Sequence, residues 1–482
     1  MKPNVVAEFR EIVGGTGVLT APEDLRTYEC DGLTNFRVVP TAVLLPQNAQ
    51  HVQAIVRVCH REKLPFVARG SGTGLSGGAL PVEGGVVISL ARMNHILEVD
   101  YKNGRAVVEP GVINSNVTLH VSPRGYFYAP DPSSQSVCSI GGNVAENSGG
   151  AHCLKYGFTT THVLGLEVVL PNGEIVHLGS STLDAPGYDL MGVFVGSEGT
   201  LGIATKVTLR IVKKPEVIET LLAAFDSTNK AGEAVGAIIA AGMLPAAIEM
   251  MDNLSIQAAE ASVHAGYPNA GGLLLVELDG PAPEVTALIA QVSEICKGLG
   301  AWEVRVAKSD EERMRVWKGR KAAFAAVGRI SPNYIVQDGV IPRTALGQIM
   351  ADIDKLSQET GVRVANVFHA GDGNLHPLVL YDRNIPGQEK KAEEVAGEIL
   401  RYCIRAGGSI TGEHGVGEEK KMFMSEMFSE PDLDTMQLVR CAFDPEKLAN
   451  PEKVFPRTKL CAERTGPYTP HPLEVAGVAE FF

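Results

Sequence analysis

Apolar and polar positions alternate in two different rhythms along the 482-residue chain. From about residue 40 to 214, short apolar runs alternate with glycine-rich turns, which is typical of short β-strands. We predict strands at TAVLLP, PFVARG, GGVVISL, RAVVEPG, LGLEVVLPNG and LGIATKVTLRIV. Between the first two, NAQHVQAIVRVCHREKL predicts a helix, because its apolar residues recur at helical spacing: Val52, Ile55, Val56, Val58 and Cys59.

The rhythm changes after KKPEV, near residues 213–217. Predicted helices at STNKAGEAVGAIIAAG and APEVTALIAQVSEICKGLG separate predicted strands at AAIEMMD, GGLLLVELDG and NYIVQDGVIP. This alternation indicates an α+β domain with an antiparallel sheet. From about residue 411 there follow the glycine-rich SITGEHGVGEEK, two helical pieces, NPEKVFP and a polar tail. We therefore divide the chain into residues 1–214, 215–410 and 411–482.

Composition narrows the class of protein. With 45% hydrophobic and 21% charged residues, the chain resembles a soluble globular protein. Its formal net charge of −13 argues against a nucleic-acid partner, since phosphate binding needs a basic surface. No stretch approaches the roughly 18 consecutive apolar residues of a transmembrane helix, and the N-terminus lacks the apolar core of a signal peptide. We expect a cytoplasmic protein that is not transmembrane.

The eight cysteines contain no CxxC pair, so we expect no iron–sulfur cluster within this chain.

A glycine-rich loop follows the second predicted strand. It contains GxGxxG at Gly72, Gly74 and Gly77. A dinucleotide-binding fold needs a helix directly after these glycines, but here Gly78, Pro81 and a new strand follow. The Rossmann interpretation therefore fails, and GxxxxGK[ST] is absent from the sequence. What remains is a strand–loop–strand unit whose backbone N–H groups can bind an anion. The alternative is an ordinary surface loop.

Two further glycine-rich stretches weaken that alternative. They are PDPSSQSVCSIGGNVAENSGGAHCLKYG and GSEGTLGI. Three such loops suit a long cofactor that needs close backbone approach along its length.

Candidate metal chemistry lies in VFHAGDGNLHPL, where His369 and His376 flank a Gly-Asp-Gly core. In one continuous strand an odd separation would send these side chains to opposite faces. The Asp-Gly core instead predicts a hairpin, in which the two imidazoles can face each other. Two histidines and a carboxylate form a common ligand set for a divalent ion, and GGSITGEHGVGEEK offers Glu413 beside His414. The alternative is a hairpin with two packed histidines and a surface glutamate.

A candidate anion-binding residue lies in MRVWKGRKAAFAAVGR. Helical spacing puts Trp317, Arg320 and Phe324 on one face. An arginine on an otherwise apolar face suits a carboxylate ligand, because its planar fork can donate two parallel hydrogen bonds. The alternative is a structural ion pair.

Three segments carry a family resemblance. Arg69–Gly78, Ser139–Gly150 and Gly196–Ile203 resemble the flavin-binding domain of the vanillyl-alcohol-oxidase/p-cresol-methylhydroxylase (PCMH) class. Together with HAGDGNLH and GEHGVG, their order resembles the FAD-linked D-2-hydroxyacid dehydrogenases, and most of all the glycolate oxidase catalytic subunits of the D type. The resemblance spans about residues 35 to 456. It implies an α+β fold: a PCMH-type FAD-binding domain, a ferredoxin-like antiparallel-sheet domain that caps the substrate, and a C-terminal helical return.

The resemblance also implies how FAD is held. The pyrophosphate would lie on the first loop: Arg69, Gly70, Ser71, Gly72, Thr73, Gly74 and Leu75. The flavin would be lined by Ser139, Gly142, Asn143 and Gly150, with Ile203 at the adenine end and Asn450 on the C-terminal return. Relatives with covalent FAD carry a histidine at the position of Thr73, so non-covalent FAD is implied.

The catalytic roles are likewise implied by the resemblance. It maps His369, His376 and Glu413 to the ligands of a divalent metal (Zn, Mn or Fe) and His414 to the catalytic base. Arg320 and Asn374 would contact the substrate. Relatives that oxidise longer dicarboxylic substrates carry polar groups where this chain has Phe324 and Val336, which favours a small monocarboxylic substrate.

The implied activity is FAD-dependent oxidation of a small 2-hydroxy acid, glycolate or D-lactate, to the 2-oxo acid. Hydride would pass to flavin N5 while the metal assists loss of the hydroxyl proton, and electrons would leave to an iron–sulfur partner subunit or a quinone. Such a partner could attach the protein peripherally to a membrane. Three alternatives stay open: a dehydrogenase for D-2-hydroxyglutarate or another D-2-hydroxyacid, a non-catalytic flavoprotein subunit, and a metal-binding scaffold without flavin.

Overall fold

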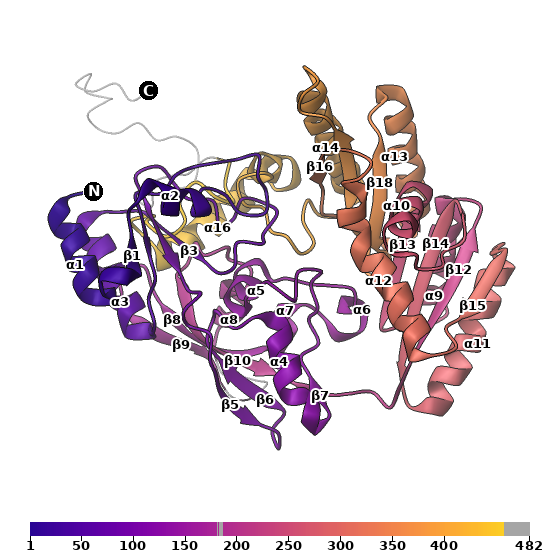
Figure 1. Cartoon of the computed structure of the whole chain (residues 1–482), viewed down its shortest axis with the longest axis horizontal. Helices are drawn as coiled ribbons and strands as arrows, with labels where there is room; N and C mark the ends of the chain where they lie inside the picture. Colours follow the sequence, from indigo (N-terminus) through magenta and orange to yellow (C-terminus); the bar gives the residue numbers. More distant parts are fainter. Residues whose placement is uncertain (181, 183–186, 457–482) are drawn as a thin grey trace.

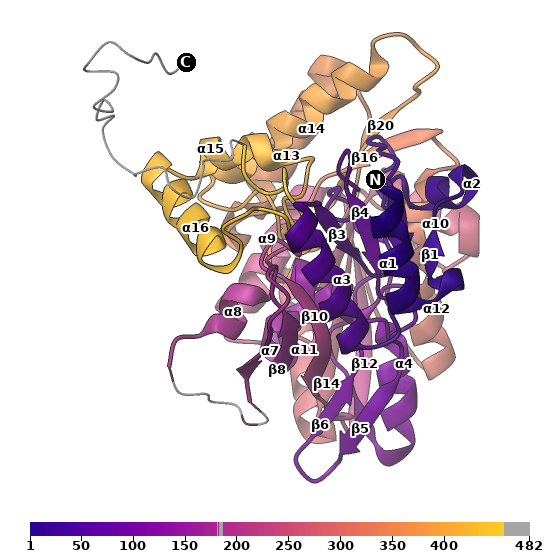
Figure 2. The same ribbon diagram turned by 90° about the vertical axis from the view of Figure 1, so that its left-hand side faces the viewer.

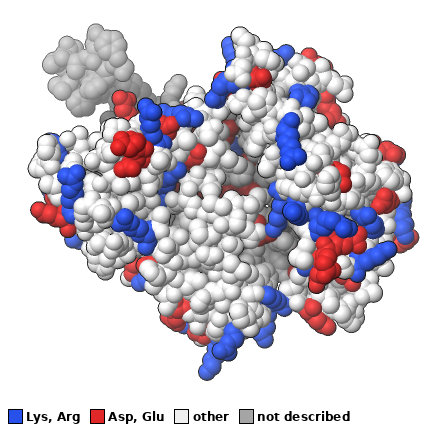
Figure 3. Space-filling view, in the orientation of Figure 1, with Lys and Arg blue, Asp and Glu red and all other residues white. Residues whose placement is uncertain are grey.

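The computed structural model describes residues 1–180, 182 and 187–456, which form two lobes. The first part of the chain builds one lobe and the middle part builds the other, with the C-terminal segment packed against the first (Figure 1). In the space-filling view the surface is hollowed between the lobes (Figure 3).

The first lobe begins with a four-stranded sheet in the order β1(Val18–Leu19), β2(Ala42–Leu44), β4(Val86–Ser89), β3(Phe66–Arg69). The strands β2, β4 and β3 are parallel and β1 is antiparallel. Helices α1(Pro3–Val13) and α3(Ala49–Glu62) lie side by side against this sheet (Figure 2). Asn48 caps α3 by accepting a hydrogen bond from the His51 backbone. The five apolar residues predicted to face the core from this helix are all buried.

A second sheet of the same lobe is antiparallel throughout. Its order is β5(Ile96–Asp100), β6(Arg105–Val108), β10(Ile203–Arg210), β8(Val163–Val169), β9(Ile175–Gly179). Its core also contains α4(Asn114–Val121) and α5(Ile140–Glu146). Shorter elements complete the lobe: α2(Pro22–Leu25), β7(Tyr126–Phe127), α6(Cys153–Tyr156), α7(Thr159–His162), α8(Leu190–Phe194) and β11(Val212–Lys213).

The second lobe, which we call the cap, is built on a large antiparallel sheet. Its main path is β15(Glu303–Val306), β12(Val217–Phe225), β14(Gly272–Gly280), β13(Ala247–Asp252), β18(Val364–His369), β19(Asn374–Leu375), β17(Gly339–Val340). Strand β20(Pro377–Tyr381) pairs with both β18 and β16(Asn333–Val336). The side chains of β12 point alternately to the two faces of the sheet. Leu221, Ala223 and Phe225 belong to the core on one face, and Leu222 and Ala224 to the core on the other.

Helices cover both faces of the cap sheet. On one face lie α9(Thr228–Ala240), α11(Ala282–Gly298), α13(Leu346–Thr360) and α14(Gln388–Arg405). On the other lie α10(Asn253–Val263) and α12(Asp310–Val327), and α12 faces the first lobe (Figure 1).

The C-terminal segment returns to the first lobe after α15(Met424–Met427) and α16(Glu430–Phe443). The Phe66 backbone donates to the Leu448 carbonyl at 2.9 Å, and Asn450 donates back to the Phe66 carbonyl at 2.8 Å. Residues 448–450 therefore extend the first sheet beyond β3. We keep the boundaries at 214/215 and 410/411 as our own proposal.

The α+β fold class, with its antiparallel cap sheet, is confirmed. One local prediction needs correction, because NYIVQDGVIP forms two short strands, β16 and β17, rather than one. The chain breaks at Gln337 and Asp338, where the Asp338 carboxylate turns to bind residues 411–414. Among the residues that the structure describes, no helix combines the length and apolar character that crossing a bilayer requires.

A histidine of the first lobe bridges to the cap. His152 Nδ1 lies 2.8 Å from Asp131 Oδ2 in its own lobe, and Nε2 lies 3.0 Å from Glu277 Oε1 on β14. The ring also stacks on Trp317 of α12. Burial alone lowers the pKa of His152, but the two carboxylates raise it well above its usual range. The charged imidazole therefore ties the lobes together.

We predict that His152→Gln destabilises the protein in a pH-dependent way, by about 1.5–3 kcal/mol at its largest, because two charge-assisted hydrogen bonds are lost. A histidine with a raised folded pKa contributes fully below its unfolded pKa of about 6.5 and loses its contribution as pH rises through the folded value. The stability difference between wild type and variant, measured by urea unfolding from about pH 5.5 to about pH 10, should shrink toward alkaline pH.

His162→Gln is a control whose effect on stability should depend on pH in the opposite direction. This buried ring contacts the Tyr156 carbonyl at 2.8 Å, and burial lowers its pKa. Its contribution should therefore shrink toward acid pH. A His152→Gln effect that is constant across the range would show that the charge of the bridge contributes nothing.

Candidate active site

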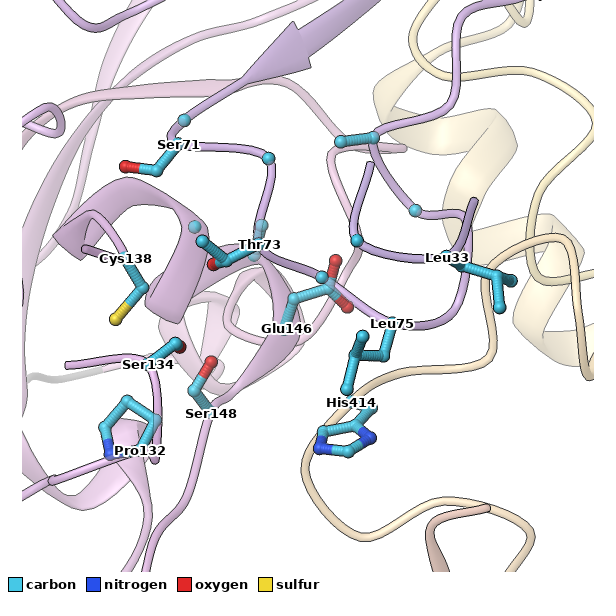
Figure 4. Close-up of a pocket in the computed structure, with 18 of the residues that line it drawn as sticks. Leu33, Ser71, Thr73, Leu75, Pro132, Ser134, Cys138, Glu146, Ser148 and His414 are labelled. Carbon is cyan, nitrogen blue, oxygen red and sulfur yellow. The ribbon is translucent and has the colours of Figure 1, made fainter. Parts of the chain in front are cut away.

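A cavity of about 610 Å³ lies between the lobes. It extends from Leu90 and Ile203 of the first lobe to His376 of the cap and His414 of the C-terminal segment. A volume of this kind is within the usual range for cofactor sites, about 300–1,000 Å³. In the close-up, Glu146 points between Thr73 and Leu75, and His414 lies beyond Leu75 (Figure 4).

Most residues predicted to hold a cofactor line this cavity. They are Arg69, Gly70, Ser71, Gly72, Thr73, Gly74, Leu75, Ser139, Gly142, Asn143 and Ile203. Gly150 and Asn450 are not among the lining residues of the described chain. Gly150 instead packs against Asp131. Asn450 supports the loops from behind, since its Nδ2 donates to the Gly78 carbonyl at 2.8 Å and to the Glu198 carbonyl at 2.6 Å.

The first two glycine-rich loops touch each other because their glycines lack side chains. A Cβ at Gly70 would collide with Ser139 Oγ, and a Cβ at Gly72, where φ is +68°, would collide with the Arg69 guanidinium. Arg69 is itself held by a 2.7 Å hydrogen bond to the Cys30 carbonyl. The loops therefore present backbone to the cavity, as close binding of an extended cofactor requires.

The two hairpin histidines meet Glu413 at the far end of the cavity. Glu413 Oε1 lies 3.4 Å from His369 Nε2 and 3.3 Å from His376 Nε2. All three residues are buried, and their ligand atoms lie within 4.8 Å of one another. The structure thus brings the two imidazoles together as the hairpin interpretation predicts.

These atoms fit a metal. Neither Nε2 atom, nor Glu413 Oε2, makes a hydrogen bond within the described chain. Nitrogen and oxygen ligands about 2.0–2.1 Å from a tetrahedral zinc lie about 3.4 Å from each other, which matches the observed separations. Burial raises the pKa of Glu413, but His369, His376 and His414 outweigh it and lower that pKa to about 2, so the carboxylate is ionised.

Glu249 orients the first of these histidines. Its Oε1 lies 2.7 Å from His369 Nδ1, which directs the other ring nitrogen, Nε2, toward Glu413. Glu249 Oε2 lies 2.5 Å from Arg320 Nη2. Arg320 is therefore buried in an ion pair beside the cavity and does not line it. Its Nε and Nη2 make no hydrogen bond of good geometry within the described residues.

His414 lies beside the three potential ligands. Its ring stacks on His376, with centroids 4.9 Å apart, and its Nε2 is 3.7 Å from Glu413 Oε1. Burial is the main cause that lowers the pKa of His414 to about 4, so the ring is neutral at pH 7 and can accept a proton. A second, overlapping potential metal group joins Asp338 to His376 and His414.

Asn374 is buried beside Asp338. Its Nδ2 donates to Asp338 Oδ1 at 2.8 Å, and a Cβ at Gly412 would collide with the amide. Among the described residues it does not line the cavity.

Sequence reasoning missed several polar residues of the site: Glu146, Glu198, Glu249, Lys321 and Asp338. Lys321 lines the cavity from α12, next to Arg320. Glu146 and Glu198 both lie against Gly415, and burial and the charge of Glu198 raise the pKa of Glu146 well above its usual range. One signal was available, since Glu249 stands between apolar residues in AAIEMM, the first six residues of the predicted strand.

Two models of protein families match the chain. One is described as the FAD binding domain and matches residues 40–179, and the other is the C-terminal domain of FAD linked oxidases and matches residues 214–454. The chain is also 52% identical over 463 residues to the glycolate oxidase subunit GlcD of Escherichia coli K12, covering 96% of this chain and 93% of that protein. The chain belongs to the FAD-linked oxidases.

Other members of the family are more distant. GlcD of Bacillus subtilis is 39% identical to this FAD-linked oxidase, covering 91% of this chain and 94% of that protein. A D-lactate dehydrogenase of Anaerostipes hadrus is 31% identical, covering 94% and 97%. Among solved structures, p-cresol methylhydroxylase with substrate bound has the same fold, with a TM-score of 0.78 at 19% identity over 93% of this chain and 95% of that chain.

These matches confirm the predicted class and fold. The chain is an FAD-linked oxidoreductase with an FAD-binding domain and the antiparallel-sheet C-terminal domain of its family.

We predict that this FAD-linked oxidase binds FAD without a covalent bond, because Thr73 in the cavity-lining loop has no nucleophilic nitrogen to offer the flavin. Acid precipitation should leave the yellow chromophore in the supernatant, with an absorption spectrum of free FAD. Colour that stays with the precipitated polypeptide would contradict this.

Proposed function

We propose that this FAD-linked oxidase oxidises a small 2-hydroxy acid, glycolate or D-lactate, to the corresponding 2-oxo acid. One observation carries the proposal: a buried set of unpartnered metal-ligand atoms and a neutral histidine lie together at one end of the cofactor cavity. The names of the relatives, glycolate oxidase subunit and D-lactate dehydrogenase, agree with this chemistry.

The three glycine-rich loops would hold FAD along the cavity. Arg69 to Leu75 would take the pyrophosphate, while Ser139, Gly142 and Asn143 would lie against the flavin and Ile203 near the adenine end. When bound, FAD supplies a hydride acceptor for the substrate carbon. Gly150 and Asn450, which lie behind the lining, would act by holding the loops in place.

His369, His376 and Glu413 would hold a divalent ion, Zn, Mn or Fe. When bound, the ion supplies a Lewis acid that makes a substrate hydroxyl easier to deprotonate. Two observations support this role: Glu249 holds the His369 ring through Nδ1, and the Glu413 carboxylate is ionised.

His414 would accept the hydroxyl proton. A free alcohol is about as weak an acid as water, with a pKa of about 16. The gap of about 12 units to a His414 pKa of about 4 corresponds to roughly 16 kcal/mol. His414 alone is therefore too weak a base for a free alcohol, which explains why the ligand group has to lie beside it.

Arg320 and Lys321 would hold the substrate carboxylate, with Asn374 as a further contact. Lys321 lines the cavity from α12. Arg320 lies beside the cavity, ion-paired with Glu249 through Nη2, and its Nε makes no hydrogen bond among the described residues. The cavity wall also includes Phe324 and Val336. These apolar side chains favour a small monocarboxylic substrate over D-2-hydroxyglutarate, the main alternative substrate class.

Electrons would then leave to an iron–sulfur partner subunit or a quinone, and a partner could hold the protein at a membrane surface. The word "subunit" in the relatives' names supports a complex. The assembled ligand group and the neutral His414 argue against a subunit without catalytic activity.

Anaerobic flavin reduction tests the substrate and the role of Arg320 together. Glycolate or D-lactate should bleach the flavin absorbance near about 450 nm, and D-2-hydroxyglutarate should do so far more slowly. Arg320→Ala should keep its FAD but lower the second-order rate constant of reduction by about 30-fold or more, since losing a charge-assisted pair costs about 2–5 kcal/mol.

If no 2-hydroxy acid reduces the wild-type flavin, the proposed function is wrong. If Arg320→Ala reduces within about threefold of wild type, the carboxylate is held elsewhere, with Lys321 as the next residue to change. Lys318→Ala, an exposed lysine on the same helix and outside the cavity lining, is the control for loss of a positive charge alone.

A second prediction separates the ligands from the base. Changing His369, His376 or Glu413 to Ala should remove the divalent ion and abolish flavin reduction, while the FAD spectrum stays. His414→Asn should keep the ion yet slow reduction by about a hundredfold, a typical cost of losing a general base. Metal content by mass spectrometry and stopped-flow reduction rates measure the two effects. Loss of the ion from His414→Asn would make this histidine a ligand instead.

A further inference from the structure

Asp338 occupies the break between β16 and β17, where it is fully buried. Its carboxylate binds one turn of the C-terminal segment. It accepts hydrogen bonds from Thr411 Oγ1 at 2.6 Å, from the Gly412 backbone at 3.0 Å and from the His414 backbone at 2.9 Å. The Glu413 backbone donates to it as well, at 3.2 Å. Four consecutive residues thus converge on one anion.

The same carboxylate also reaches the histidine hairpin. Asp338 Oδ1 accepts from Asn374 Nδ2 at 2.8 Å and lies 3.4 Å from His376 Nε2. Lys420 Nζ lies 3.3 Å from Oδ2 and balances the charge. Asp338 is therefore where the hairpin of the cap and the 411–414 turn are joined.

This arrangement orients two neighbouring side chains differently. With its backbone N–H groups held by Asp338, the turn directs Glu413 toward His369 and His376. It also lays the His414 ring flat on His376, with an angle of 2° between the ring planes. Adjacency in the sequence does not by itself fix the directions of the Glu413 and His414 side chains. The hydrogen bonds from the backbone of this turn to Asp338 hold both residues in place.

We propose that Asp338 is a positioning residue that holds Glu413 and His414 at the separation the reaction needs, an inference that rests on the proposed function. It acts through its hydrogen bonds and is not itself a metal ligand. Its two oxygens already face six donors, from Thr411, Gly412, Glu413, His414, Asn374 and Lys420. A cation would have to displace several of these, which argues against the alternative group of Asp338, His376 and His414.

Asp338→Asn tests the proposal, because the amide places hydrogens against backbone N–H groups while the volume is kept. We expect the FAD content to stay unchanged. Metal affinity should fall about 10–100-fold, as is usual when a residue that holds a metal ligand in place is changed. The limiting rate of flavin reduction should fall by at least about tenfold. The substrate dissociation constant from stopped-flow reduction should change by less than about threefold. Thr411→Val, which removes one donor, should shift metal affinity and rate in the same direction by a smaller factor.

Asp252→Asn is the matched control. Asp252 is a buried carboxylate at the end of β13 in the same cap, and it accepts hydrogen bonds from the Ser255 backbone at 2.8 Å and the Asn366 backbone at 2.7 Å. Asp252→Asn should lower thermal stability about as much as Asp338→Asn does. Its metal affinity and reduction rate should stay within about threefold of wild type.

The proposal is overturned if Asp338→Asn keeps both metal affinity and reduction rate near wild type, or if Asp252→Asn lowers them as much. If Asp338→Asn does not fold, Thr411→Val tests the proposal by the same two measurements, metal affinity and the rate of flavin reduction. Failure of the proposed function gives a different result, since the wild-type flavin is then not reduced by any 2-hydroxy acid. The metal affinities of the variants still test the positioning role in that case.

Discussion

The structure depends on a buried carboxylate that faces two imidazoles without a hydrogen bond between them. Glu413 is ionised, and its Oε2, like Nε2 of His369 and His376, has no hydrogen-bond partner among the described residues. Glu413 Oε1 is within ion-pair distance of both imidazoles, at 3.3–3.4 Å, but buried polar atoms without hydrogen bonds still carry a desolvation cost of about 1–3 kcal/mol each. In the proposed function, a divalent cation bound among them would remove that cost. The surrounding structure serves to hold these atoms together, with Glu249 behind His369 and Asp338 behind the turn that carries Glu413.

Two parts of the chain supply this group and a third packs against it, which links the fold to the proposed chemistry. The histidines come from the cap hairpin and Glu413 from the C-terminal segment, while the first lobe contributes Gly149, where a Cβ would approach Glu413 Oε2 to 2.8 Å. The group therefore lies where the cap, the C-terminal segment and the first lobe meet. The His152 bridge between the lobes lies nearby and stabilises the same junction. In the proposed function FAD would be held by the loops of the first lobe and the proton acceptor is His414 of the C-terminal segment, so hydride and proton would leave the substrate toward different parts of the chain.

The amino-acid sequence predicts most of the fold, because short apolar runs and helical periodicity are local properties. It also predicts the histidine hairpin, since the Asp-Gly turn specifies how His369 and His376 meet. What it cannot predict are contacts between distant segments. Asp338 and the Glu413 backbone are 75 positions apart, and nothing near Asp338 in the sequence reveals its partner. The same holds for Arg320, whose helical face is predictable but whose ion pair with Glu249 depends on how α12 packs on the sheet.

A crystal structure of the metal-loaded protein, with anomalous data collected at the absorption edge of the bound metal, tests the central claim most directly. The account predicts one strong anomalous peak among His369 Nε2, His376 Nε2 and a Glu413 carboxylate oxygen, about 2.0–2.3 Å from each. The Asp338 carboxylate should remain on the backbone of the 411–414 turn. A peak bound by Asp338 and His414 instead, or no peak in protein that reduces its flavin at full rate, would contradict the account.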